Sequence, residues 1–198
     1  MTAPMHVPRF FVRQRITVMV NRYEIRGATP DGSEGQLLAF AQQKRMKLKE
    51  EVVFYADGSR SRPVFSFKAR QRLDVHAEHD VFDEQGVPLG MFSKDFAASL
   101  LRSTWRLSAP GLEAVGKERR LFTAILRRIW DVIPYIGDIW VPFVFHFDFV
   151  DTATGQPVLS SERRKSIRDR YVIDVPDPRV DFRVAASMAV ALDALQSR

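Results

Sequence analysis

The residues whose types and spacing most clearly suggest a chemical role lie between Lys117 and Trp130. At the spacing of a helix, one face of this segment would be apolar and the other would carry arginines. The side chains that matter most are Arg119, Arg120, Arg127 and Arg128 among the basic ones, and Phe122 and Trp130 among the apolar ones. Arginines at lipid phosphates beside aromatic rings at the acyl boundary are typical of an interfacial membrane anchor. The segment is therefore a candidate for contact with an anionic membrane.

This basic segment continues into an apolar and aromatic stretch that contains Tyr135 and Trp140 and is broken by two prolines. The whole stretch interrupts the spacing of the strands predicted on either side, so we interpret Gly116–Val141 as an insertion between two strands. Two other interpretations stay open beside the membrane anchor. The apolar face could cover the mouth of a barrel, or it could form a homodimer or partner contact. The predicted membrane or partner contacts are Phe122, Trp130, Tyr135 and Trp140.

Lys68 and Arg70 form a second candidate site, because residues two apart on a strand share one face. Several other basic pairs of the chain have the same spacing. Exposed residues on the outer face of a sheet explain most such pairs. We therefore weigh an anion-binding pair against an ordinary solvated surface.

No residue pattern predicts catalysis or a bound cofactor. The chain has no cysteine, no Gly-x-Ser-x-Gly motif and no glycine-rich phosphate loop. His76 and His79 could suggest a metal site, but residues three apart on a strand face opposite sides and no third ligand is evident. We therefore predict a protein that is not an enzyme and that binds no metal or cofactor.

The composition is that of one ordinary folded domain with a basic surface. The chain has 198 residues, of which 45% are hydrophobic, and a net charge of +6. Such a charge favours anionic partners. The aromatic residues alternate as core residues, which argues against nucleic acid as the partner. No apolar stretch is long enough to cross a bilayer as a helix and no secretion signal is found, so we expect a cytoplasmic protein, peripheral at the inner face of the membrane if it binds lipid.

Five hairpins organise most of the chain. In each, an alternating apolar run leads through a turn rich in Asp, Gly or Pro into a second apolar run, as half-buried strands require. The hairpins cover 23–40, 52–67, 80–92, 105–115 and 145–159, and two further strands are predicted in Phe10–Val20 and Arg170–Val175. About twelve short strands with evenly spaced turns predict a closed β-barrel or a sandwich.

The C-terminal segment predicts one buried helix. Asp177 and Pro178 suit a first turn, and only three residues from Phe182 to Leu195 are polar. A helix that is apolar nearly all round is buried, and its many alanines keep it thin. We therefore predict an all-β barrel filled by the helix at 178–195. A helix docked on one open sheet face is the alternative.

This order of parts resembles the tubby-like superfamily, in particular bacterial LURP-one-related and phospholipid scramblase-like proteins. The residues that carry the resemblance are Gln43–Glu51, Phe65–Arg70, Asp80–Asp83 with Gly86 and Gly90, Ser103–Trp105, and Asp177–Leu195. The resemblance implies a twelve-stranded barrel around a central helix, and lipid head-group binding by the pair Lys68 and Arg70. The chain has none of the palmitoylated cysteines of scramblases and no acidic calcium loop, so the resemblance does not extend to scramblase activity.

Together these patterns predict a single domain, 1–198, with the insertion at 116–141 and the central helix at 178–195. We expect a non-enzymatic module that binds anionic lipid head groups or a membrane surface. Its predicted head-group contacts are Lys68, Arg70, Arg119, Arg120, Arg127 and Arg128. The alternative function is a protein-interaction scaffold that homodimerises or binds a partner through the apolar face of the insertion.

Overall fold

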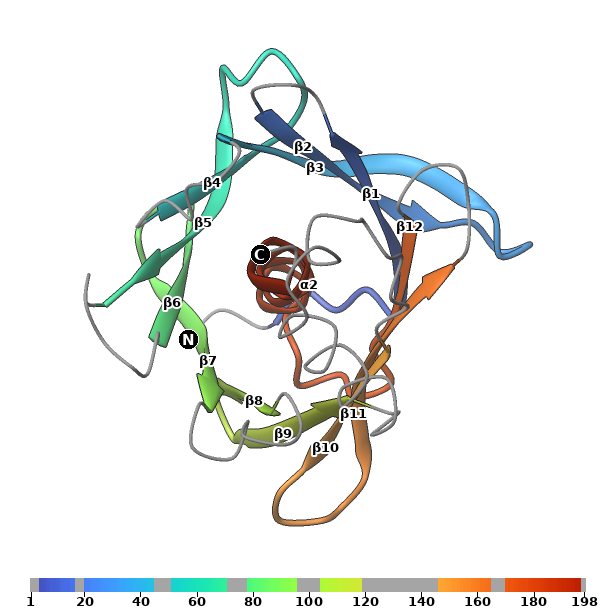
Figure 1. The fold of residues 1–198 in the computed structure, drawn as a ribbon, viewed down its shortest axis with the longest axis vertical. Helices are drawn as coiled ribbons and strands as arrows, with labels where there is room; N and C mark the ends of the chain where they lie inside the picture. Colours follow the sequence, from blue (N-terminus) through green and yellow to red (C-terminus); the bar gives the residue numbers. More distant parts are fainter. Residues whose placement is uncertain are drawn as a thin grey trace, which may run out of the picture.

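A computed structural model describes residues 4–16, 20–44, 51–70, 78–95, 104–118, 146–164 and 170–196. In this part of the chain, twelve antiparallel strands surround one helix, α2 (Phe182–Gln196), as Figure 1 shows. The strands are β1 (Arg9–Ile16), β2 (Val20–Ala28), β3 (Glu34–Lys44), β4 (Glu51–Tyr55), β5 (Pro63–Ala69), β6 (Glu78–Asp83), β7 (Pro88–Asp95), β8 (Thr104–Ala109), β9 (Leu112–Glu118), β10 (His146–Asp151), β11 (Pro157–Arg164) and β12 (Arg170–Asp174).

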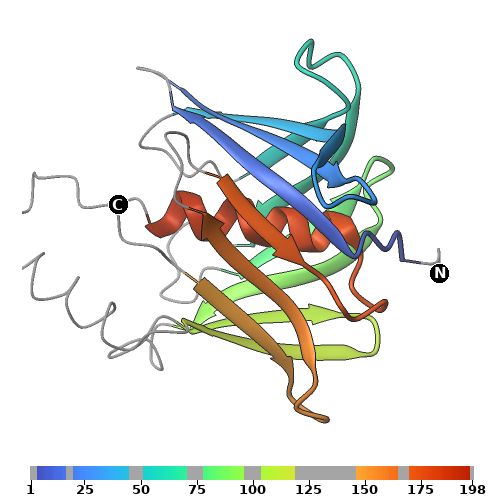
Figure 2. The same ribbon diagram turned by 90° about the vertical axis from the view of Figure 1, so that its right-hand side faces the viewer.

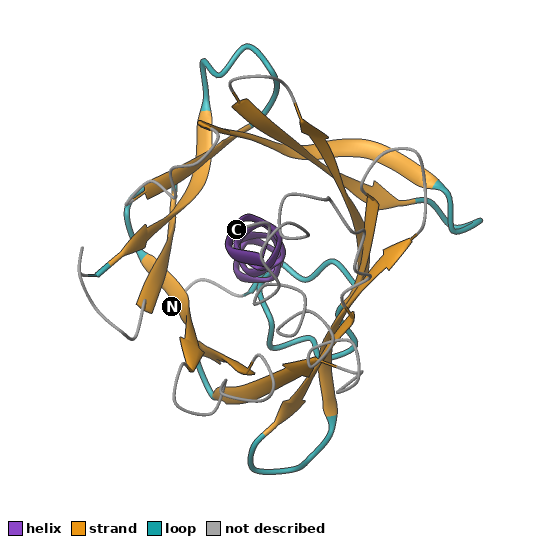
Figure 3. Ribbon diagram, in the orientation of Figure 1, coloured by secondary structure: helices purple, strands orange, loops and turns teal. Residues whose placement is uncertain are grey.

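The strands follow one another around a closed barrel, each hydrogen-bonded to its neighbours in the sequence (Figure 3). The barrel closes because β1 pairs with β12, in a register that runs from Arg9 opposite Asp174 to Arg13 opposite Arg170. All five predicted hairpins and both additional strands are confirmed, although the strand predicted for Phe10–Val20 ends at Ile16, and Val20 begins β2. The sheet closes into a barrel and does not form a sandwich. Closure gives each of the twelve described strands a hydrogen-bonded neighbour on both sides.

Alternating burial along the strands and short turns between them account for this barrel. In β5, Phe65 and Phe67 are buried inside, whereas Lys68 is exposed outside. In the turn after β6, the Asp83 carboxylate accepts two backbone N–H groups at 2.9 and 2.8 Å. Gly86 in the same turn has a φ of +81°, which glycine adopts without the strain that a side chain would add.

The helix α2 runs through the interior of the barrel (Figure 2). Its small side chains are buried against the strands, namely Ala185, Ala186, Ala189 and Ala191. The approach is close: a Cβ added at Gly90 of β7 would lie 3.2 Å from Cγ2 of Val184. The helix therefore fills the barrel as predicted, and the alternative of docking on an open sheet face is wrong because the sheet is closed.

The helix begins at Phe182 rather than at Pro178, so its predicted start was too early. Residues 177–180 form a turn, in which the Val180 N–H donates to the Asp177 carbonyl at 3.2 Å. Asp181 then caps the helix, because its Oδ1 accepts the N–H of Arg183 at 2.8 Å. Asp177 and Pro178, which suggested the first turn of the helix, belong to the turn that precedes it, and Asp181 is the N-cap.

The two ends of the barrel differ. At the turn end, short turns join β2 to β3, β4 to β5, β6 to β7, β8 to β9 and β10 to β11, and the Phe182 ring packs on Phe10 and Phe65 at 5.2 and 6.1 Å. At the exit end, β1, β3, β5, β7, β9 and β11 finish and α2 reaches Gln196. Figure 2 shows the chain's N-terminus toward the turn end and its C-terminus toward the exit end. Every internal segment outside the described residues connects two strands at the exit end.

The predicted insertion at Gly116–Val141 lies mostly outside the described residues. Its first three residues, 116–118, are part of β9, where Gly116 pairs with Phe149 of β10. A Cβ at Gly116 would lie 2.3 Å from Cε1 of Phe149, so this position has room for glycine alone. The predicted start of the insertion was therefore too early, because close packing inside the barrel needs Gly116 in the strand.

Candidate functional site

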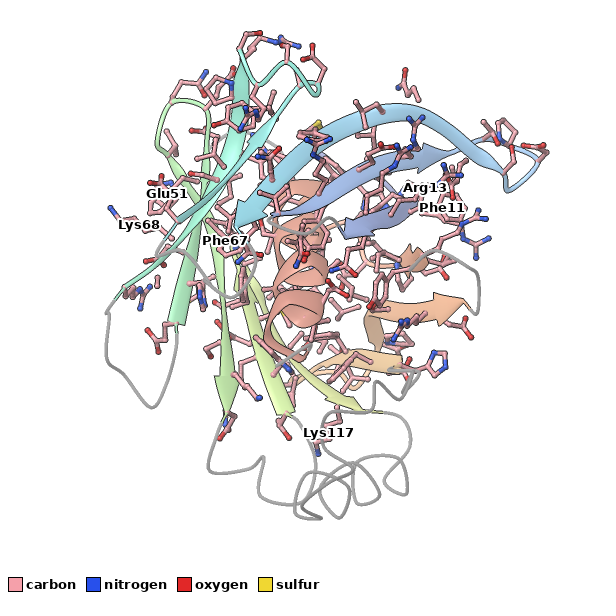
Figure 4. All side chains as sticks on the ribbon, turned by 45° about the horizontal axis from the view of Figure 1, so that its top comes forward. Phe11, Arg13, Glu51, Phe67, Lys68 and Lys117 are labelled. Carbon is pink, nitrogen blue, oxygen red and sulfur yellow. The ribbon has the colours of Figure 1, made fainter. Side chains whose placement is uncertain are left out.

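Lys68 and Arg70 share the outer face of the barrel, as their spacing predicts. Both are exposed, and in the register of the sheet Lys68 lies between Glu51 of β4 and Asp80 of β6. Figure 4 shows Lys68 and Glu51 together on this wall, with Phe67 of the same strand on the inner side. The two side chains therefore share one exposed face of the barrel.

The Arg70 guanidinium is already bound by two carboxylates. Its Nε and Nη2 donate to the two oxygens of Asp80 at 2.7 and 2.8 Å, and its Nη1 donates to Glu78 at 2.7 Å. The hydrogen bond to Asp80 is the largest cause that raises the pKa of Arg70 above its usual value. A phosphate at Arg70 would have to displace these carboxylates. Their negative charges offset the positive charge of Lys68 and Arg70, which weakens the attraction of this pair for a lipid head group.

The other predicted site residues lie outside the described residues. They are Arg119, Arg120, Phe122, Arg127, Arg128, Trp130, Tyr135 and Trp140. Their predicted roles stay predictions. The structure does define where their segment is attached, because β9 ends at Glu118 and β10 begins at His146, both at the exit end. Lys117, just before that attachment, is labelled in Figure 4.

A basic surface that sequence reasoning did not single out covers the outer face of β12, β1 and β2. Its arginines alternate with side chains that point into the barrel, such as Val12 and Tyr23. We call this surface the arginine wall, and it consists of Arg13, Arg15, Arg22, Arg26 and Arg170, with Glu24 and Glu34 among them. Alternation alone could have placed each arginine outside, but the pairing of the strands was needed to bring them together.

Glu34 bridges two arginines of the wall. Arg13 and Arg170 lie directly opposite each other on β1 and β12, and each Nε lies 2.5 Å from a different oxygen of Glu34. The Glu34 side chain is only 8% exposed, and it contacts both arginines through ion pairs. Glu34 begins β3, so the β2–β3 hairpin reaches across to β12, as Figure 1 shows. Arg170 also lies over the Phe11 ring, 4.7 Å from its centre.

Arg15 and Arg22 are a second directly opposed pair, across β1 and β2. The Arg15 side chain is 50% exposed and its Nε lies 3.3 Å from Glu24. Glu24 is shared, because Arg26 lies at the same distance from its other oxygen. Arg22 is exposed, and none of the described residues forms an ion pair with it. Like charges directly opposite each other destabilise a sheet.

Inside the barrel, polar side chains gather near the exit end. The Tyr23 hydroxyl donates to Asp193 of α2 at 2.9 Å, and the Tyr171 hydroxyl donates to the other oxygen of the same carboxylate. Gln14 donates to the Tyr23 hydroxyl at 3.4 Å. The pKa of Tyr23 is raised above its usual value, mainly by burial of the hydroxyl and secondly by the negative charge of Asp193. These contacts join the last turns of α2 to β1, β2 and β12.

The histidines do not form a metal centre in the described part of the chain. There, no group of three or more His, Cys, Asp or Glu side chains could hold a metal ion. His79 is fully buried, and its ring stacks on Phe92 with 5.0 Å between the ring centres. His76 lies outside the described residues. His79 therefore serves the packing of β6 on β7.

A comparison with models of protein families matches residues 38–193 to the LURP-one-related family. The chain belongs to the LURP-one-related family. The match begins in β3 and ends in α2, so it includes the helix that fills this LURP-one-related barrel. The resemblance seen in the sequence is thereby confirmed. No curated protein matches the chain.

Within the described residues, this LURP-one-related protein has no helix that is both long and apolar enough to cross a bilayer.

Proposed function

We propose that this LURP-one-related domain binds anionic phospholipid surfaces with the exit end of its barrel. The observation that supports the proposal is a separation of charge along the barrel axis. At the turn end, the acidic residues Asp31, Asp57, Asp83, Glu84, Asp151, Asp177 and Asp181 outnumber the basic residues Arg60, Arg62, Arg179 and Arg183. Hydrogen bonds within the turns lower the pKa of Asp31 and Asp57, so both are charged near neutral pH. An anionic surface repels this end.

Positive charge is in excess in the chain segments whose flanking strands end at the exit end. These segments lie outside the described residues, and their sequences contain Arg45, Lys47, Lys49, Arg72, Arg102, Arg119, Arg120, Arg127, Arg128, Lys165 and Arg168, against Glu50, Asp74, Asp131, Asp138 and Asp169. The described rim adds Arg15 and Arg22 of the arginine wall. Basic residues attract an anionic leaflet, and apolar neighbours can enter the interface. The two ends thus favour one orientation on a membrane.

The experiment is sedimentation of the pure protein with vesicles of phosphatidylserine and phosphatidylcholine, and with vesicles of phosphatidylcholine alone. We expect binding to the anionic vesicles that weakens as salt rises, because counterions screen the attraction. The variants R119Q/R120Q and R127Q/R128Q each remove two charges from the segment between β9 and β10, two strands whose adjoining ends lie at the exit end. The matched control is R60Q/R62Q, which removes two exposed charges at the turn end. We expect the first two variants to bind anionic vesicles more weakly and the control to bind like the wild type.

Two results would contradict this function. Equal weakening in R60Q/R62Q would mean that total charge, and not the exit end, governs binding. No binding of the wild type to anionic vesicles at low salt would refute lipid binding altogether. In that case, light scattering would test the alternative of a protein contact: a dimer that dissociates in F122S would support it.

A further inference from the structure

In the arginine wall, Arg13 lies directly opposite Arg170 and Arg15 lies directly opposite Arg22, and the two pairs differ in their counter-charges. The carboxylate of Glu34 lies between Arg13 and Arg170, and each of its oxygens is 2.5 Å from the Nε of one arginine. Between Arg15 and Arg22 the described residues place no carboxylate, and Glu24 beside Arg15 is shared with Arg26. In the first pair, a carboxylate thus lies between two opposed arginines of this wall.

The second pair has the geometry for a larger anion. Residues directly opposite in an antiparallel sheet have Cβ atoms about 5 Å apart, so two guanidinium groups can reach one tetrahedral anion. A phosphate offers oxygens to both arginines at once, and arginine binds such groups with two parallel hydrogen bonds. The repulsion between Arg15 and Arg22 in the free protein would then become attraction in the complex.

The position of the pair also fits the proposed orientation. Arg15 is the second-last residue of β1 and Arg22 the third residue of β2, so both stand at the rim of the exit end. Three other basic residues near that rim face carboxylates. Arg70 is held by Asp80 and Glu78, Arg106 is paired with Asp95 at 2.9 Å, and Lys117 lies opposite Asp148.

We infer that Arg15 and Arg22 form a phosphate-binding site that holds the head group of an anionic phospholipid. This inference rests on the proposed membrane binding and adds to it a defined contact on the barrel wall. The site lies on strands far along the chain from 119–128, so the two sets of arginines can be separated by mutation.

The test compares R15Q/R22Q with R60Q/R62Q, which has the same loss of charge at the turn end. On phosphatidylserine vesicles we expect R15Q/R22Q to bind about thirtyfold more weakly than the wild type, because each arginine at an anionic surface contributes roughly fivefold. The second measurement is the unfolding temperature in inorganic phosphate and in chloride at equal ionic strength. Phosphate should stabilise the wild type and R60Q/R62Q, but not R15Q/R22Q.

The outcomes separate the site from the function on which it rests. Vesicle binding by R15Q/R22Q at the wild-type level would overturn the inference and leave the proposed function intact. A wild type that binds no vesicles but gains stability in phosphate through Arg15 and Arg22 would overturn the lipid assignment and support a site for a soluble phosphate. A wild type that responds to neither probe would overturn both. In chloride, R15Q/R22Q should unfold at about the wild-type temperature, because it loses both the repulsion between the two arginines and the exposed contact of Arg15 with Glu24.

Discussion

Tyr23 and Asp193 are 170 residues apart in the sequence, yet the hydroxyl of one donates to the carboxylate of the other at 2.9 Å inside the barrel. Both side chains are buried, with exposed fractions of 0% and 7%. The carboxylate also accepts a hydrogen bond from Tyr171. The second strand and the last one are thus joined to the central helix through a single acidic group.

Replacing this acidic group should destabilise the barrel strongly. In Asp193→Ala, two buried tyrosine hydroxyls lose their acceptor, and each unsatisfied group costs about 1–3 kcal/mol. We expect the free energy of unfolding to fall by about 3 kcal/mol, measured by urea denaturation. The control is Glu84→Gln, an exposed change at the turn end that should be nearly neutral. A loss for D193A as small as that of E84Q would contradict a structural role for the network.

The cap of the central helix should make stability depend on acidity. Burial by itself would raise the pKa of Asp181, but the hydrogen bond from Arg183 and those from backbone N–H groups lower it overall. A carboxyl whose pKa is lower in the folded state than its ordinary 3.8 stabilises the protein above that value. This contribution is lost as the pH falls through the folded-state pKa.

Asp181→Asn keeps an N-cap side chain but removes the charge. We therefore expect this variant to lose less stability than the wild type between about pH 5 and pH 3, measured by thermal unfolding across that range. Asp181→Ala also loses the cap, which costs about 1 kcal/mol at neutral pH. Identical pH profiles for D181N and the wild type would show that Asp181 does not contribute to acid sensitivity.

Gly116 in β9 should tolerate no side chain. Its missing Cβ leaves the space that the Phe149 ring occupies, and the added atom would lie 2.3 Å from that ring. Gly116→Ala should lower the free energy of unfolding by about 1–3 kcal/mol through overpacking. Because the clash is with one ring, G116A/F149L should be more stable than the sum of the single changes predicts. Additive losses in this double-mutant cycle would place the strain elsewhere.

Removing the carboxylate that bridges Arg13 and Arg170 should have opposite effects on stability and on membrane binding. Glu34→Gln leaves these opposed arginines without their counter-charge, so we expect an easier thermal unfolding. It also frees positive charge on the wall, so binding to phosphatidylserine vesicles should strengthen about fivefold. Glu84→Gln changes the net charge equally at the turn end. Equal gains in E34Q and E84Q would argue against a role for the arginine wall.

Local chemistry explains why most of the fold was predictable. Turns such as Asp83–Gly86 have a side chain that satisfies backbone N–H groups and a glycine at positive φ, so their positions follow from residue type. The alanine-rich run after Phe182 is too apolar for any place but a core, which predicted the helix inside the barrel. Its first residue was misplaced because Asp177 and Asp181 are both good caps by type.

The candidate site was only partly predictable, because it depends on which strands meet. Residue type and alternation placed Lys68 and Arg70 on one outer face, but not the carboxylates of Glu78 and Asp80 that hold Arg70. The spacing of Arg13 and Arg15 was visible in the sequence, yet it did not distinguish them from other basic pairs. Arg22 became their neighbour only through the register of β1 with β2.

By itself, then, the sequence determined the strands, their turns and the apolar helix inside the barrel, since these elements follow from residue types and from contacts between residues close in the chain. Tertiary structure alone decided that Arg15 faces Arg22, that Glu34 reaches Arg170, and that Tyr23 meets Asp193. The physical reason is that these pairs form when the barrel closes and sets one register for all its strands. A shift of one residue in that register would turn every arginine of the wall toward the core.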